Sequence, residues 1–189
     1  MTGKTHQSIG LTVGLASYLF LVPASYNPAT FAWVLIVSSF FSLLPDIDQP
    51  AARIWSKLPF GTILGELVNP FIQHRNISHS FLGIGLTAWA FYQLLMNLPA
   101  YWGINTQYVL VAGLLGYTSH LLADMITVQG IPLFFPYQRM FGIPPRPFEG
   151  IRIQTGQWFE NLVVFPVVDL LFLLLLFTYR SNIAHILFK

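Results

Sequence analysis

Two pairs of closely spaced polar residues interrupt long apolar stretches of this sequence. His120 and Asp124 are four residues apart, so a helix would place both side chains on one face, one turn apart. Asp46 and Asp48 follow a proline and flank one isoleucine, and in an extended segment their side chains would point the same way. Each pair has the residue types and spacing of metal ligands. The alternatives are a histidine paired with a carboxylate for packing and a helix-ending turn.

A third cluster lies at residues 74–80, just before another apolar run. His74 and His79 are five residues apart, and Arg75 lies between them. The planar guanidinium group of arginine pairs with two oxygens of a phosphate or carboxylate. An arginine beside two imidazoles therefore suits a metal site that binds such an anion. The alternative is a basic cluster that binds lipid headgroups at a membrane surface.

The remaining candidates are single residues, and the composition narrows the choice of metal. The chain has no cysteine, which leaves His, Asp and Glu as ligands and favours zinc, manganese or iron. His6 and Glu160 lie at the starts of two apolar runs. Alone, each would be a capping or solvated residue, and the helix dipole favours a carboxylate in a first turn. Together with the clusters, they predict a metal centre.

The composition indicates a membrane protein. The 189 residues are 54% hydrophobic and 8% charged, whereas soluble domains are about 25% charged. We expect a single all-α domain over residues 1–189, a bundle of about five transmembrane spans. The net charge of +2 gives no reason to expect a nucleic-acid partner, and the oligomeric state is left open. The expected spans are residues 9–22, 29–44, 80–98, 108–123 and 162–179.

Two segments between the spans are expected to lie outside the bilayer core. Residues 49–73 are rich in Pro and Gly and predict a broken, interfacial segment. Residues 125–160 contain five prolines and predict a loop that covers one end of the bundle. A Gly10–Gly14 pair in the first span predicts close helix packing, and Asn27 before Pro28 predicts a helix start.

Threading five spans through a membrane puts every candidate ligand on the same side. Most Lys and Arg residues fall on that side too, so the positive-inside rule makes it cytoplasmic. Asp169 is an exception, since it lies in the middle of the last span. It is half a turn out of phase with Glu160, so we expect it to face away from the site and to be hydrogen-bonded within the bundle.

The motifs resemble the YdjM family, described as LexA-regulated, inner-membrane-associated, metal-dependent hydrolases. The resemblance covers nearly the whole chain and implies a multi-pass protein of the bacterial inner membrane. It is carried by His6, Pro45-Asp46-Ile47-Asp48, His74-Arg75-Asn76-Ile77-Ser78-His79-Ser80, Gly116-Tyr117-Thr118-Ser119-His120-Leu121-Leu122-Ala123-Asp124 and Thr155-Gly156-Gln157-Trp158-Phe159-Glu160.

A more distant likeness joins the chain to zinc-dependent phospholipase C and P1 nuclease. This likeness implies a helical phosphodiesterase, but the chain has Met1 in place of that group's terminal tryptophan ligand. It also has Gly156 where the group has a histidine, so one or two zinc ions are expected instead of three. The ligands it implies are His6, Asp48, His79, His120, Asp124 and Glu160.

The resulting hypothesis is a membrane-bound hydrolase that cleaves a phosphoester, such as a lipid or lipid-linked phosphate, with zinc or manganese. His74 joins the expected ligands, and Arg75 would hold phosphate oxygens. Whichever of Asp46 and Asp48 does not bind metal would be the general base, and we assign that role to Asp46 and the ligand role to Asp48. The alternatives are a metal or proton transporter and a non-catalytic protein with a structural metal.

Overall fold

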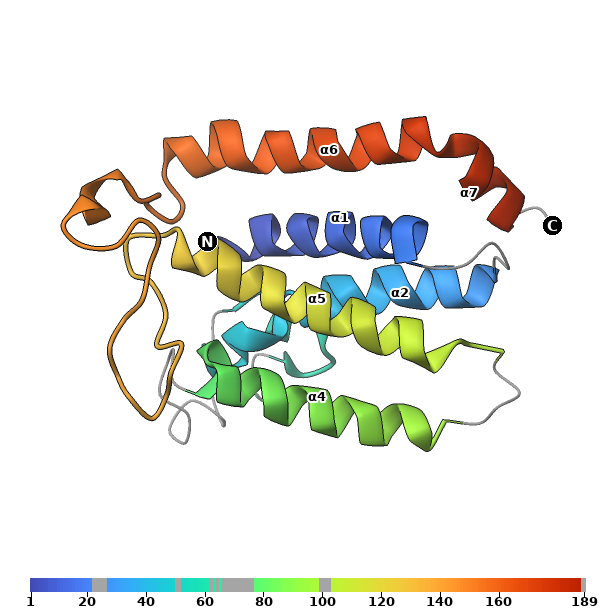
Figure 1. Cartoon of the computed structure of the whole chain (residues 1–189), viewed down its shortest axis with the longest axis horizontal. Coiled ribbons are helices and arrows are strands. Elements are labelled where there is room, and N and C mark those ends of the chain that lie inside the picture. The colour runs from blue at the N-terminus through green and yellow to red at the C-terminus, as the bar shows by residue number, and fades with distance from the viewer. Residues whose placement is uncertain are drawn as a thin grey trace.

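The computed structural model describes residues 1–21, 27–49, 52–61, 63, 65, 77–98 and 103–187. All regular elements in this part of the chain are helices or helical turns. The described residues form no strand, only two isolated bridges in the segment after residue 125. The all-α prediction is confirmed. The main helices are α1 (Gly3–Leu21), α2 (Pro28–Phe41), α4 (Phe81–Met96), α5 (Thr106–Met125), α6 (Phe165–Thr178) and α7 (Arg180–Leu187). All but α7 lie side by side along the long axis of the molecule, and α7 bends away from the line of α6 (Figure 1).

Short helical turns connect these helices. A π-helical turn, η6 (Glu160–Val164), leads directly into α6. Residues 126–159 form an irregular lobe, here called the cover, at the end of the bundle where the N-terminus lies (Figure 1). The 3₁₀ turns are η1 (Leu44–Asp48), η2 (Trp55–Lys57), η3 (Ile77–His79) and η5 (Phe148–Ile151).

Side chains cap the helices at their N-termini. Asn27 accepts hydrogen bonds from the backbone N–H groups of Ala29 and Thr30 at the start of α2, which confirms the predicted helix start. Ser80 caps α4, and Asn105 caps α5 in the same way. These caps fix where α4 and α5 begin.

Glycine contacts bring α1, α2 and α5 close together. A Cβ at Gly10 would lie 2.4 Å from Ser42 Oγ, and one at Gly14 would lie 2.8 Å from Ser38 Cβ, so the predicted glycine face is confirmed. Ser38 Oγ donates to the Gly10 carbonyl at 2.7 Å. A Cβ at Gly116 would lie 2.3 Å from the Ser38 carbonyl oxygen, so the backbones of α5 and α2 touch.

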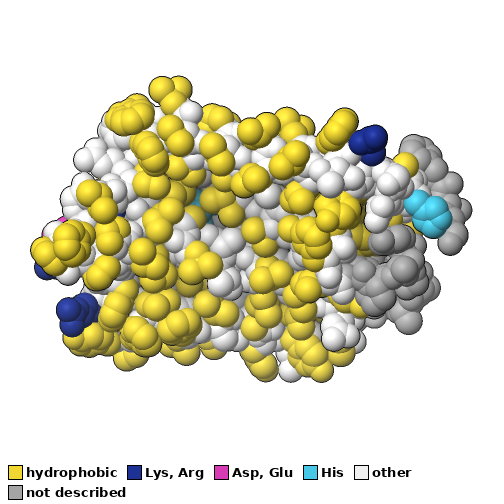
Figure 2. Space-filling view, turned by 45° about the horizontal axis from the view of Figure 1, so that its top comes forward, with side chains coloured by type: hydrophobic (Ala, Val, Ile, Leu, Met, Phe, Trp, Pro, Cys, Tyr) yellow, Lys and Arg dark blue, Asp and Glu magenta, His cyan; other side chains and the backbone are white. Residues whose placement is uncertain are grey.

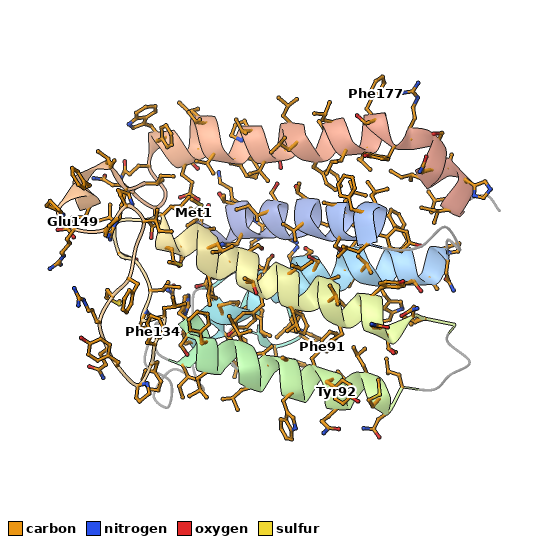
Figure 3. The ribbon with its side chains drawn as sticks, in the orientation of Figure 1. Met1, Phe91, Tyr92, Phe134, Glu149 and Phe177 are labelled. Atoms are coloured by element: carbon orange, nitrogen blue, oxygen red, sulfur yellow. The ribbon has the colours of Figure 1, made fainter. Side chains whose placement is uncertain are left out.

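The outer faces of α4 and α6 are apolar and exposed. In α4, Phe91 points into the bundle whereas Tyr92 points away from it (Figure 3). Apolar side chains cover the visible face of the molecule (Figure 2). The exposed large apolar residues of α4 and α6 include Trp89, Leu94, Leu170, Leu173, Leu174 and Phe177. A surface of this kind suits the hydrocarbon of a bilayer better than water.

Among the described residues, Glu160–Thr178 is the one helix long and apolar enough to cross a membrane. Helices α2 and α4 are apolar but have 14 and 16 residues. Helices α1 and α5 have 19 and 20 residues, but polar side chains interrupt them. The helical bundle is therefore confirmed, whereas the number of five spans stays a prediction.

Candidate metal centre

Five His and Asp residues from four elements meet at one end of the bundle. His6 comes from α1, Asp46 from η1, His79 from η3, and His120 and Asp124 from the last turns of α5. The three histidines are fully buried, Asp124 is 1% exposed, and Asp46 is 16% exposed. Residues more than a hundred positions apart in the chain thus form one buried polar cluster.

Three atoms of this cluster, from Asp46, His79 and His120, form one group of potential ligands, and Asp124 lies beside its two nitrogens. His79 Nε2 lies 3.3 Å from His120 Nε2, and both nitrogens lie 3.6 Å from Asp46 Oδ1. Asp124 Oδ2 lies 3.8 Å from His79 Nε2 and 3.9 Å from His120 Nε2. In tetrahedral zinc sites with bonds of roughly 2.0–2.1 Å, the ligand atoms are about 3.3–3.4 Å apart. A zinc-sized ion therefore fits among these atoms with small adjustments.

The packing of α2 against α5 sets the tautomer of His120. Its Nδ1 atom lies 2.8 Å from the carbonyl oxygen of Ser42. Because a carbonyl oxygen can only accept, Nδ1 carries the hydrogen and donates it. The lone pair of Nε2 then points to the cluster, which is the arrangement of a metal-binding histidine.

A second chain of hydrogen bonds orients His79. The Ser78 hydroxyl donates to Asp48 Oδ2 at 3.1 Å and lies 3.0 Å from His79 Nδ1. Since this hydroxyl uses its hydrogen on Asp48, its oxygen accepts from the Nδ1–H of His79. Tyr117 Oη donates to the Ser78 carbonyl and holds η3 against α5. The Nε2 atom of His79 is thereby directed toward the cluster.

The structure places Asp46 and Asp48 against different nitrogens of His79, so the two side chains do not point the same way as the sequence suggested. Asp46, predicted as the base, joins His79 and His120 in a group of potential ligand atoms. Asp48, predicted as a ligand, lies behind His79, with Oδ2 at 4.0 Å from Nδ1. The physical reason is the 3₁₀ turn η1, in which residues two apart differ by about 240° in direction, unlike residues of an extended segment.

The electrostatic surroundings of Asp46 support a ligand role. Burial alone would raise the pKa of its carboxyl group, but the nearby His120 and His79 rings lower the pKa well below its usual range. The carboxylate is therefore ionised near neutral pH. An ionised carboxylate of this kind binds a cation readily and is a weak general base.

His6 extends the cluster to a second group of ligand atoms with His120 and Asp124. Its ring stacks on that of His120 with centroids 3.7 Å apart, and its Nε2 lies 3.2 Å from Asp124 Oδ1. Among the described residues, neither ring nitrogen of His6 makes a hydrogen bond of good geometry, although both are buried and Nε2 faces the Asp124 carboxylate. Buried polar atoms such as Nδ1 are rarely left without a hydrogen bond, and this surrounding fits a ring that would bind a cation.

Asp124 lies between the two groups of ligand atoms. Its Oδ1 also contacts the amino group of Met1, which lies beside the last turn of α5 (Figure 3). Because Nε2 of His120 has a single lone pair, it can serve one ion only. Two ions would therefore share the Asp124 carboxylate, with Oδ2 facing His79 and Oδ1 facing His6. The described residues thus offer two overlapping groups of three potential ligands, which would hold a metal ion at either position.

Glu160 lies in neither group of ligand atoms and joins α6 to the N-terminal segment. Its Oε1 accepts from the backbone N–H and the hydroxyl of Thr2 and from the hydroxyl of Thr5, each at 2.7 Å. Its Oε2 accepts from the N–H of Gly156 at 2.7 Å. This carboxylate holds the segment that carries His6.

We expect Glu160→Gln to lower the free energy of unfolding by about 1–3 kcal/mol while the bound metal is retained, because a charged acceptor of four hydrogen bonds is lost. Thermal unfolding and elemental analysis of the same detergent-purified samples measure both effects. Glu149→Gln in the exposed part of the cover is the control. A loss of metal in Glu160→Gln alone would show instead that this residue is a ligand.

The other predicted residues have different outcomes. His74 and Arg75 lie outside the described residues. Asp169 is in neither ligand group and accepts a hydrogen bond from Ser8 Oγ, as expected for a residue bonded within the bundle. Sequence reasoning overlooked Ser78, although it directly precedes His79 and its hydroxyl is in reach of two site residues.

The fold and the cluster define a helical protein with an apolar exterior and a buried His–Asp centre at one end. The chain belongs to the YdjM inner membrane protein family, whose family model matches residues 1–186. No solved structure matches the chain, and the likeness to phospholipase C and P1 nuclease stays an interpretation.

Three relatives span most of the chain. It is 30% identical to inner membrane protein YdjM of Escherichia coli strain K12 over 148 residues, 76% of this chain and 70% of the relative. The same values hold for inner membrane protein YdjM of Shigella flexneri. The chain is also 29% identical over 164 residues to the protein named uncharacterized protein YvsG of Bacillus subtilis strain 168, which covers 87% of this chain and 88% of the relative.

Proposed function

We propose that this protein is a metal-dependent phosphoester hydrolase of the bacterial inner membrane. The observation that carries the proposal is the group formed by Nε2 of His79 and His120 with Oδ1 of Asp46, spaced as potential ligands of one metal ion, with the Asp124 carboxylate beside both nitrogens. Zinc is proposed because two imidazoles and two carboxylates suit it, and manganese is the alternative.

A bound metal would supply a water of lowered pKa and would neutralise charge that develops on a phosphoester. The chain's own residues prepare the site for this chemistry. Hydrogen bonds with Ser42 and Ser78 orient the imidazoles of His120 and His79. The burial of these side chains excludes bulk water. Asp46 is the most exposed of the five cluster residues, so we propose that the substrate arrives on its side.

The membrane location is proposed on two grounds. Relatives in the family are named inner membrane proteins, and α4 and α6 expose long apolar faces. We propose a multi-pass arrangement in which α1, α2, α4, α5 and α6 cross the bilayer as short or tilted helices. The distribution of Lys and Arg supports a cytoplasmic position for the proposed metal centre.

A structural metal site is the second candidate function. If Asp124 bound the same ion as Asp46, His79 and His120, a tetrahedral site would have no open position, which is typical of structural zinc. For hydrolysis, one ligand must give way to water, and the partly exposed Asp46 is placed to do so.

Turnover distinguishes these two functions. The zinc-loaded protein in detergent is mixed with a panel of phosphomonoester and phosphodiester lipids, and product release is followed with and without chelator. We expect release that the chelator abolishes and that Asp46→Asn lowers by roughly 100-fold or more, since the metal environment changes. Stoichiometric zinc without any turnover across the panel would contradict hydrolysis and favour the structural role.

A further inference from the structure

A cavity of about 590 Å³ opens beside the metal centre. Asp46 lines it, and no other member of the His–Asp cluster does. Lys4 and Arg53 contribute positive charge to its wall, and Gln129 of the cover adds a polar amide. Small-molecule sites commonly have volumes of roughly 300–1,000 Å³. The cavity therefore has the size and position of a substrate site for the proposed centre.

Arg53 has the features of a ligand-binding residue in this wall. Its side-chain stem lies against α1, where a Cβ at Gly3 would be 2.7 Å from Arg53 Cβ. Among the described residues, no hydrogen bond or ion pair engages its guanidinium group. Arg152 differs, since its guanidinium donates to the carbonyls of Pro144 at 2.8 Å and Gly142 at 3.2 Å. The Arg53 stem is thus held in place while its charged end stays available.

The charges in the cavity favour an anion with several oxygens. A guanidinium group binds two oxygens of a phosphoryl group through parallel hydrogen bonds. Lys4 adds a cation to the same wall, although its Nζ also lies 5.0 Å from the ring centroid of Phe165. A phosphoryl group between Arg53 and Asp46 would border the metal centre.

We propose that this cavity binds the phosphoryl group of the substrate and that Arg53 is the residue that recognises it. The proposal deepens the proposed hydrolase function and rests on it for the role of the metal. It does not depend on turnover, because inorganic phosphate alone is a probe of the same chemistry. Arg53 takes the role that the sequence suggested for Arg75.

Calorimetric titration of the full-length protein in detergent with inorganic phosphate tests the proposal. Wild type is compared with Arg53→Gln and with Lys57→Gln, an exposed lysine that does not line the cavity. Each protein is titrated with zinc loaded and again after chelation, and its metal content is measured. We expect Arg53→Gln to weaken phosphate binding at least about tenfold, whereas Lys57→Gln leaves it unchanged.

A second variant tests the same site without removing the charge. In Gly3→Ala the new methyl group must displace the Arg53 stem, so we expect weaker phosphate binding with an intact arginine. Wild type that binds no phosphate, or an Arg53→Gln variant that binds it as wild type does, would overturn the proposal. A wild-type protein that cannot be loaded with zinc would contradict the hydrolase function instead. The phosphate titrations performed after chelation would still decide the role of Arg53.

The source of the phosphoryl group is distinguished by competition. Phosphatidic acid in mixed micelles and soluble glycerol 3-phosphate are each added to the phosphate titration. We expect phosphatidic acid to compete at the lower concentration, since the apolar exterior places the site at a membrane. Competition by glycerol 3-phosphate at equal or lower concentration would assign a soluble phosphate to the cavity, and competition by neither would overturn the proposal.

Discussion

His120→Ala is expected to remove the bound metal from the protein. In wild type we expect one or two zinc ions per chain after gentle purification in detergent. His120 belongs to both groups of potential ligands, so its loss removes one ligand from each group. Changes in groups that only orient ligands lower metal affinity about 10–100-fold, and removal of a ligand should exceed that. Elemental analysis measures the result.

Two comparisons separate metal loss from misfolding. His79→Ala removes a ligand contributed by η3, and it should lose metal as His120→Ala does. His185→Ala in α7, a helix whose histidine joins neither ligand group, should keep the wild-type content. The circular dichroism spectrum of each variant is compared with that of wild type to check that the helical content is retained. Wild type that holds no metal after reloading with zinc or manganese would contradict the metal centre.

Helical spacing in the sequence predicted which polar residues of α5 lie together. His120 and Asp124 lie on one face of α5 and enter the same cluster, because four residues make about one helical turn. The start of α2 at Asn27–Pro28 and the close packing at Gly10 and Gly14 were also predicted. These features depend on local backbone geometry, which the sequence specifies directly.

Features that depend on tertiary contacts were harder to predict. The roles of Asp46 and Asp48 depend on a 3₁₀ turn, which a Pro-Asp-Ile-Asp sequence does not distinguish from an extended segment. Three of the four hydrogen bonds to Glu160 come from Thr2 and Thr5, more than 150 residues away, so no local pattern showed that its carboxylate accepts so many bonds. Hydropathy does not identify α1 and α5 as spans, because both helices carry polar site residues that lower their mean hydropathy.

Gly116→Ala is expected to destabilise the protein and to disturb the metal centre together. The new methyl group would lie 2.3 Å from the carbonyl oxygen of Ser38, so α5 must move away from α2. Overpacking of this kind costs about 1–3 kcal/mol of unfolding free energy. Four residues further along each segment, His120 Nδ1 donates a hydrogen bond to the Ser42 carbonyl oxygen. The shift should therefore lengthen that bond and release the imidazole from its fixed orientation.

Gly85→Ala is the matched control, because a Cβ at Gly85 in α4 would meet no atom within 4 Å. Alanine in a helix interior is more favourable than glycine by about 0.5–1 kcal/mol, so this variant should unfold at the same or a higher temperature with its metal retained. Unfolding temperature and zinc affinity are measured for both variants. If Gly116→Ala has the unfolding temperature and zinc affinity of wild type, the prediction is wrong. In that case α2 and α5 can separate without changing the orientation of His120. The expected parallel loss would show that the glycine contact between these helices sets the geometry of the metal centre.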